Sequence, residues 1–145
     1  MAIKRQDSRA WALVDSNVLL DVFENDTQWF EWSVTQLDCY ARSHRLFINP
    51  VIYAEISIGF EKIEEVDAAV TKAGLKVSPI PRPALFRAGK AFLQYRHNQR
   101  TKRSPLPDFF IGAHALVSGA VLITRDATRY RSYFPGLNLI APGST

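Results

Sequence analysis

The hydrophobic positions of this chain form short apolar runs, and longer segments of mixed polarity separate them. A short apolar run bounded by polar or turn-forming residues is typical of a buried strand. We predict strands at 11–14, 46–48, 75–80, 121–123 and 137–140.

The segments between these runs predict helices. Ser16 can cap a first helical turn, and Pro50 lies at a position that favours a helix start. Gly74 and Gly119 are placed to end helices. The predicted helices are 18–23, 26–44, 50–59, 61–73, 83 to about 100, and one that begins at 107 or 108 and ends at 119. A polar, proline-containing loop is expected at 101–107.

Alternation of buried strands with helices predicts an α/β fold in which a parallel sheet is covered on both faces. About five strands would form the central layer of a three-layer α/β/α arrangement. The length of 145 residues fits one domain, spanning 1–145. No apolar run approaches the roughly 20 residues that a membrane-spanning helix needs, so we expect no membrane association.

Acidic residues occur where this fold would build a binding site. Asp15 directly follows the first strand, and Asp126 follows the fourth by three positions. Ligands of parallel sheets gather at the carboxyl ends of the strands. Asp108 begins a predicted helix, while Glu55 lies inside an apolar one and is expected to be partly shielded. A shielded carboxylate usually needs a partner or a metal ion.

Each acid also has a purely structural interpretation. Asp15 can form a side-chain turn, Asp108 and Asp126 can cap helical turns, and Glu55 can pair with an arginine. These roles together do not explain why four acids point to one region. Clustered carboxylates repel one another unless a cation is present. Mg²⁺ prefers oxygen ligands and substrate phosphate, and Mn²⁺ can substitute for it. Two such ions would stabilise both oxygens of a phosphodiester displacement.

The distribution of charge indicates a polyanionic substrate. Between Ala68 and Pro107 there are nine basic residues and no acid, so the other 105 residues carry a net charge of −5. A basic segment beside an acidic remainder is typical of a protein that brings nucleic acid to a metal site. A solvated helix face is an equally good interpretation. The candidate phosphate contacts are Arg87, Arg96, Arg100, Lys102, Arg103 and Arg125.

Four short motifs occur in order along the chain. They are Val14 to Leu19, Asn49-Pro50 with Ala54-Glu55, Leu106 to Phe109 followed by Ala113 and Ala115, and Leu122 to Asp126. In this order and spacing they resemble the PIN-domain family, and within it the toxin ribonucleases of VapBC-type toxin–antitoxin pairs.

The resemblance implies a PIN-like fold and a magnesium-dependent RNA endonuclease. It implies that Asp15, Glu55, Asp108 and Asp126 form the catalytic and metal-binding set. Ser16, Asn17 and Thr124 would support these acids or orient water, although capping and turn formation explain them equally well. The resemblance also implies an RNA substrate, a cognate antitoxin and a homodimer. A cytoplasmic location fits the single cysteine, Cys39.

Other functions give different sequence patterns. A housekeeping PIN nuclease in RNA maturation would share the same acids and remains an alternative. A receiver-like or other non-catalytic domain needs an adjacent early acidic pair and a late lysine, but Asp7 and Asp15 are apart and no lysine follows Lys102. A haloacid-type phosphatase needs Asp-x-Asp, and Asp15-Ser16-Asn17 lacks the second acid.

Overall fold

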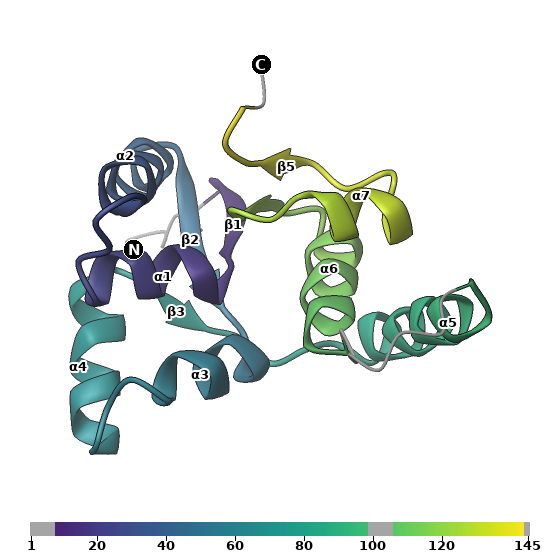
Figure 1. Cartoon of the computed structure of the whole chain (residues 1–145), viewed down its shortest axis with the longest axis horizontal. Coiled ribbons are helices and arrows are strands. Elements are labelled where there is room, and N and C mark those ends of the chain that lie inside the picture. The colour runs from purple at the N-terminus through teal and green to yellow at the C-terminus, as the bar shows by residue number, and fades with distance from the viewer. Residues whose placement is uncertain (1–7, 99–105, 144–145) are drawn as a thin grey trace, which may run out of the picture.

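The computed structural model describes residues 8–98 and 106–143, in which a five-stranded sheet lies between two layers of helices (Figure 1). The strands are β1 (Ala10–Val14), β2 (His44–Ile48), β3 (Lys76–Val77), β4 (Val121–Ile123) and β5 (Leu139–Ile140). The helices within these ranges are α1 (Ser16–Phe23), α2 (Phe30–Ala41), α3 (Pro50–Ser57), α4 (Ile63–Lys72), α5 (Arg82–Asn98), α6 (Leu106–Ser118) and α7 (Thr128–Tyr133). The predicted α/β/α fold with a five-stranded parallel sheet is confirmed.

The order of the strands places a crevice at the centre of the sheet. The order is β3-β2-β1-β4-β5, with every neighbouring pair parallel. From β1 the chain moves outward to β2 and β3, then crosses to β4 and β5 on the other side. Because parallel crossovers are right-handed, this reversal puts α1 to α4 on one face and α5 to α7 on the other, as Figure 1 shows. A ligand crevice forms where the direction reverses, at the carboxyl ends of β1 and β4.

The predicted helix at 26–44 is wrong at both ends. The Asp26 side chain accepts hydrogen bonds from the backbone N–H groups of Gln28 and Trp29, at 2.9 and 2.8 Å. This local turn competes with helix formation, and α2 begins only at Phe30. At the other end, His44 already belongs to β2. The predicted strand at 75–80 is reduced to the two residues of β3.

The core is formed by the central strands and the helices that face them. Leu13 and Val14 of β1 and Leu122 of β4 are fully buried. On α6, Gly112 leaves space for aromatic rings of the α7 region, because a Cβ atom there would lie 2.5 Å from the ring of Phe134 and 3.1 Å from that of Tyr130. Among the described helices, none has the length and apolar character to cross a membrane.

Candidate active site

Asp15 lies at the carboxyl end of the central strand and is held by several donors. Its backbone N–H continues the sheet by donating to the carbonyl of Ile123 on β4, at 2.9 Å. Its side chain caps α1, because Oδ1 accepts from the N–H of Ser16 at 2.8 Å. The predicted capping role of Ser16 is therefore wrong, and Asp15 is the N-cap. Asp15 is only 3% exposed, so the carboxylate is almost fully removed from water.

Glu55 reaches the same place from α3. Asn49 caps this helix by accepting from the N–H of Ile52 at 2.9 Å, and Pro50 starts its first turn. The hydroxyl of Ser16 donates to Glu55 Oε1 at 3.0 Å and lies 3.5 Å from Asp15 Oδ1. One serine hydroxyl therefore bridges two acids that lie on different elements. As expected from its apolar neighbours, Glu55 is half-buried.

Asp108, on α6, contacts the site through the hydroxyl of a tyrosine. It is the third residue of the helix, in the first turn, so it is not the N-cap. The hydroxyl of Tyr130, on α7, lies 2.9 Å from Asp15 Oδ2 and 3.4 Å from Asp108 Oδ1. The phenol thus links the acid after β1 to the acid on α6.

The three acids interact electrostatically. Burial raises the pKa of Asp15 from 3.8 to about 6, against the lowering effect of hydrogen bonds from Thr124 and Tyr130, and the charge of Asp108 adds to the rise. Burial also raises the pKa of Glu55, and the charges of Asp15 and Asp108 contribute. Burial and the neighbouring carboxylates raise the pKa of Tyr130, so the phenol stays protonated and donates. Such a group of mutually repelling carboxylates is suited to a cation.

Asp126 joins the site through its backbone. The hydroxyl of Thr124 donates to Asp15 Oδ2 at 2.8 Å and accepts from the N–H of Asp126 at 3.1 Å. Asn17 supports the same loop: its Nδ2 donates to Thr124 Oγ1 at 3.4 Å, and its Oδ1 accepts from the N–H of Arg125 at 3.2 Å. Asp126 itself is exposed. The hydroxyl of Thr124 therefore holds the backbone of Asp126 beside Asp15, while the side chain of Asp126 remains exposed.

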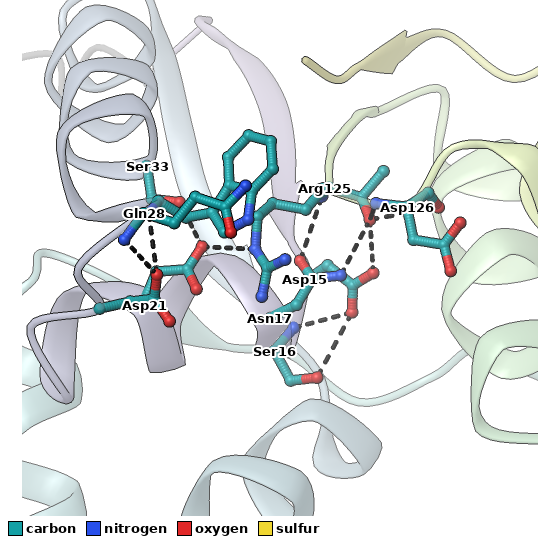
Figure 2. A network of polar contacts seen from close by, with 11 residues as sticks. Asp15, Ser16, Asn17, Asp21, Gln28, Ser33, Arg125 and Asp126 are labelled. Atoms are coloured by element: carbon teal, nitrogen blue, oxygen red, sulfur yellow. Dashed lines mark hydrogen bonds and ion pairs between the residues drawn. The ribbon is translucent and has the colours of Figure 1, made fainter.

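The guanidinium of Arg125 is held within the protein. Its Nε lies 2.6 Å from Oδ2 of the buried Asp21, which also accepts from the hydroxyl of Ser33 at 2.7 Å (Figure 2). The guanidinium also lies 5.3 Å from the ring centre of Trp29. This network, shown in Figure 2, ties the loop after β4 to α1 and α2, and it keeps Thr124 and Asp126 in place.

A search of protein-family models found a match to the PIN domain over residues 12–133. This chain belongs to the PIN-domain family. The matched region extends from β1 to the end of α7 and contains all four predicted acids. A search of the curated proteins found no significant match.

Solved structures with the same fold include several bacterial complexes. VapBC2 from Rickettsia felis, bound to a DNA fragment from its promoter, matches with a TM-score of 0.69 and 16% identity, covering 90% of this chain and 98% of the other. A toxin–antitoxin complex from Klebsiella pneumoniae gives 0.67 and 21%, with coverages of 92% and 99%. VapBC-1 from nontypeable Haemophilus influenzae gives 0.66 and 21%, with coverages of 90% and 97%. At these identities the likeness establishes the shared fold.

The acids of the PIN domain lie near one another, but their side chains do not form a complete set of metal ligands. Among residues 8–98 and 106–143, no three His, Cys, Asp or Glu side chains are arranged as a group that could hold a metal ion. The donor chemistry nevertheless fits a hard divalent cation, because every candidate ligand is a carboxylate. Mg²⁺ commonly keeps several waters and uses only one or two carboxylates directly. The residues present therefore fit such an ion bound partly through water.

The predicted phosphate contacts are distributed unevenly. Arg87 and Arg96 are exposed on α5, which packs against α6 on the side away from α1 (Figure 1). Arg125 is only partly exposed, with 29% of its side chain accessible, and it pairs with Asp21. Arg100, Lys102 and Arg103 lie outside the described residues.

Sequence reasoning missed two functional candidates, Tyr130 and Asp21. Tyr130 lies in a segment expected only to turn, and no local pattern indicates that its hydroxyl meets two acids distant in sequence. Asp21 had a weak signal: it is an acid in a helix whose neighbours are apolar, which is the feature that identified Glu55.

Proposed function

We propose that this PIN domain is a divalent-metal-dependent nuclease that hydrolyses phosphodiester bonds of RNA, with Mg²⁺ as the ion and Mn²⁺ as a substitute. The observation that carries the proposal is the convergence of Asp15, Glu55 and Asp108 around the hydroxyls of Ser16 and Tyr130, with the backbone of Asp126 held beside Asp15 by Thr124. These acids come from four separate parts of the sequence. Their mutual repulsion is unfavourable for stability, and a function that requires negative charge explains why they remain together.

Each residue has a defined task in this proposal. Asp15, Glu55, Asp108 and Asp126 would hold the ion. Bound there, a divalent ion supplies electrophilic stabilisation of the phosphate and lowers the pKa of an attacking water. Ser16 and Thr124 fix the orientation of the Glu55 and Asp15 carboxylates through hydrogen bonds of 3.0 and 2.8 Å. Asn17 holds the backbone of the loop that carries Asp126.

The proposal predicts cleavage that depends on the metal. Purified protein incubated with a labelled single-stranded RNA should cleave it in Mg²⁺ or Mn²⁺. Cleavage should stop in excess EDTA and return when Mg²⁺ is restored above the chelator. Because all proposed ligands are carboxylates, Zn²⁺-specific activity is not expected. Undiminished cleavage in EDTA, with contaminating nuclease excluded, contradicts the proposal.

We further propose that the protein is the toxin of a toxin–antitoxin pair in the cytoplasm, acting as one PIN domain over residues 1–145 and as a homodimer. The VapBC and other toxin–antitoxin complexes that share this fold support the proposal. Expression of the protein alone should arrest growth, and co-expression with the product of an adjacent short reading frame should relieve the arrest. Normal growth despite verified nuclease activity would leave the nuclease proposal and remove the toxin proposal, favouring a role in RNA maturation.

A further inference from the structure

The hydroxyl of Tyr130 occupies a position that the sequence does not predict. It lies between two of the proposed ligands, 2.9 Å from Asp15 Oδ2 and 3.4 Å from Asp108 Oδ1. Tyr130 is 2% exposed. The phenol therefore lies inside the site and is shielded from solvent.

Packing fixes the ring of Tyr130 in this position. The backbone N–H of Phe134 donates to the carbonyl of Tyr130 at 2.8 Å, which closes the last turn of this region. On α6, Gly112 faces the ring, and a Cβ at this position would lie 3.1 Å from Tyr130 Cδ1. Gly112 lies one helical turn after Asp108, so both lie on the same face of α6. The absence of a side chain at Gly112 thus lets the phenol reach the carboxylate one turn earlier.

The two oxygens of Asp15 are held differently. Oδ2 lies within hydrogen-bond distance of two hydroxyls, those of Thr124 at 2.8 Å and Tyr130 at 2.9 Å. Oδ1 has one short contact, with the N–H of Ser16, and is the oxygen nearer the Ser16 hydroxyl that bridges to Glu55. A carboxylate oxygen can accept about two hydrogen bonds. Oδ2 therefore has two short hydrogen bonds, whereas Oδ1 has one short hydrogen bond and a longer contact of 3.5 Å with the Ser16 hydroxyl.

We propose that Tyr130 is a positioning residue of the metal site, whose hydroxyl locks Asp15 Oδ2 and draws Asp108 toward it so that the carboxylates are oriented before an ion arrives. The inference rests on the proposed metal-dependent function. Donors that orient ligating side chains commonly change metal affinity when they are removed. Since both acids come from different elements, the phenol is a direct hydrogen-bonded link between the end of β1 and α6.

The alternative role is that of a core aromatic whose hydroxyl makes its hydrogen bonds wherever partners exist. Tyr133 provides a matched control for that role. It lies on the same helix, one turn later, and packs edge-on against Phe109 with ring centres 5.1 Å apart. Replacing either tyrosine by Phe removes one hydroxyl and keeps the ring. The Tyr130→Phe change removes the hydroxyl that is bonded to the acids.

The test is a calorimetric titration of Mn²⁺ into metal-free wild type, Tyr130→Phe and Tyr133→Phe, at a pH of about 7 to 8, above the raised pKa of Asp15. We expect Tyr130→Phe to bind Mn²⁺ about tenfold more weakly than wild type, and Tyr133→Phe to bind as wild type does. Cleavage by Tyr130→Phe should need correspondingly more Mn²⁺ for half-maximal rate and recover at saturating ion. Circular dichroism confirms that each variant is folded, and the shift in melting temperature with added Mn²⁺ gives a second measure of affinity.

Two outcomes overturn the inference. Equal Mn²⁺ affinity in Tyr130→Phe and wild type would show that the hydroxyl serves packing alone. Tighter binding by Tyr130→Phe would show that the hydroxyl competes with the ion. A wild-type protein that binds no Mn²⁺ would instead refute the proposed function, so the two failures are separable.

Discussion

Replacing Asp15 by Asn removes one negative charge from the centre of the site and changes little else in shape. Asn is as good an N-cap as Asp, so α1 keeps its cap from Oδ1 to the N–H of Ser16. The pKa of Asp15 is raised by burial, which means that the ionised carboxylate destabilises the folded state. We therefore expect the metal-free Asp15→Asn variant to be more stable than wild type at neutral pH.

The size of this gain in stability follows from the shift in the pKa of Asp15. A rise from 3.8 to about 6 corresponds to about 3 kcal/mol of folding free energy. The pKa of Asp15 is higher in the folded protein than in the unfolded chain. The wild type therefore has this stability in full below about pH 4, where Asp15 is protonated, and loses it as the pH rises through 6. The amide that replaces the Asp15 carboxylate would face the hydroxyls of Thr124 and Tyr130, which would then have to accept in place of donating. That rearrangement offsets the gain by about 1 kcal/mol.

A net gain of about 2 kcal/mol should raise the melting temperature by about 6 °C for a domain of this size. Thermal unfolding is followed by circular dichroism in EDTA between about pH 3 and pH 8 for wild type, Asp15→Asn and Asp38→Asn, a range that brackets both pKa values of Asp15. Asp38 is exposed on α2 and serves as the control for loss of a surface charge. Histidine titration is common to all three proteins and cancels in the differences.

The difference in stability between Asp15→Asn and wild type should be near zero at about pH 4, grow as the pH rises from about 4 to about 6, and level off above about 6. In saturating Mg²⁺ the order should reverse, because an ion at about 100 times its Kd stabilises only the wild type, by about 2.7 kcal/mol. A variant that is less stable than wild type by the same amount at every pH would refute the reasoning. That result would mean that Asp15 contributes hydrogen bonds and that its charge carries no penalty.

Three other changes separate the roles of the site residues. Asp108→Asn should abolish cleavage while the protein stays folded, whereas a plain helix-start role would leave cleavage intact; a labelled-RNA assay with circular dichroism decides. Arg125→Gln should destabilise the fold by about 2 kcal/mol, because it leaves the buried Asp21 carboxylate without the cation that is paired with it. Chemical denaturation measures this loss, and the Asp21→Asn/Arg125→Gln double variant should recover part of it. Arg100→Ala with Arg103→Ala should flatten the slope of log affinity for RNA against log salt by about one to one and a half units in an Asp15→Asn background, and an unchanged slope would assign these residues to another partner.

The fold could be predicted because its central strands contain short apolar runs that are buried on both faces. Runs such as Leu13-Val14 and Leu122-Ile123 have no other stable location than the centre of a covered sheet. The boundaries were less predictable, since they depend on local hydrogen bonds. The side chain of Asp26 delays α2, and β3 ends early because its one hydrogen-bonded neighbour in the described sheet is β2.

The acids could be recognised from their places at strand ends and on apolar helix faces, whereas their supporting contacts could not. Tyr130 meets Asp15 across 115 positions of sequence, and Arg125 meets Asp21 across 104. Such contacts arise from the reversal of strand order at β1, which no periodicity encodes. The sequence makes Arg125 a candidate phosphate contact because it lies beside an acid of the site. Its pairing with Asp21 becomes visible only when α1 and the loop after β4 are placed together.

The most direct test of the carboxylate site compares RNA cleavage by wild type, Asp15→Asn and Asp38→Asn, purified identically and assayed with the same labelled RNA in excess Mg²⁺. Asp15 lies at the centre of the proposed ligand set, and Asp38 lies on the surface of α2. We predict that wild type and Asp38→Asn cleave at the same rate, and that Asp15→Asn shows no cleavage above background although it is folded and still binds RNA. Cleavage by Asp15→Asn at the wild-type rate would contradict the account.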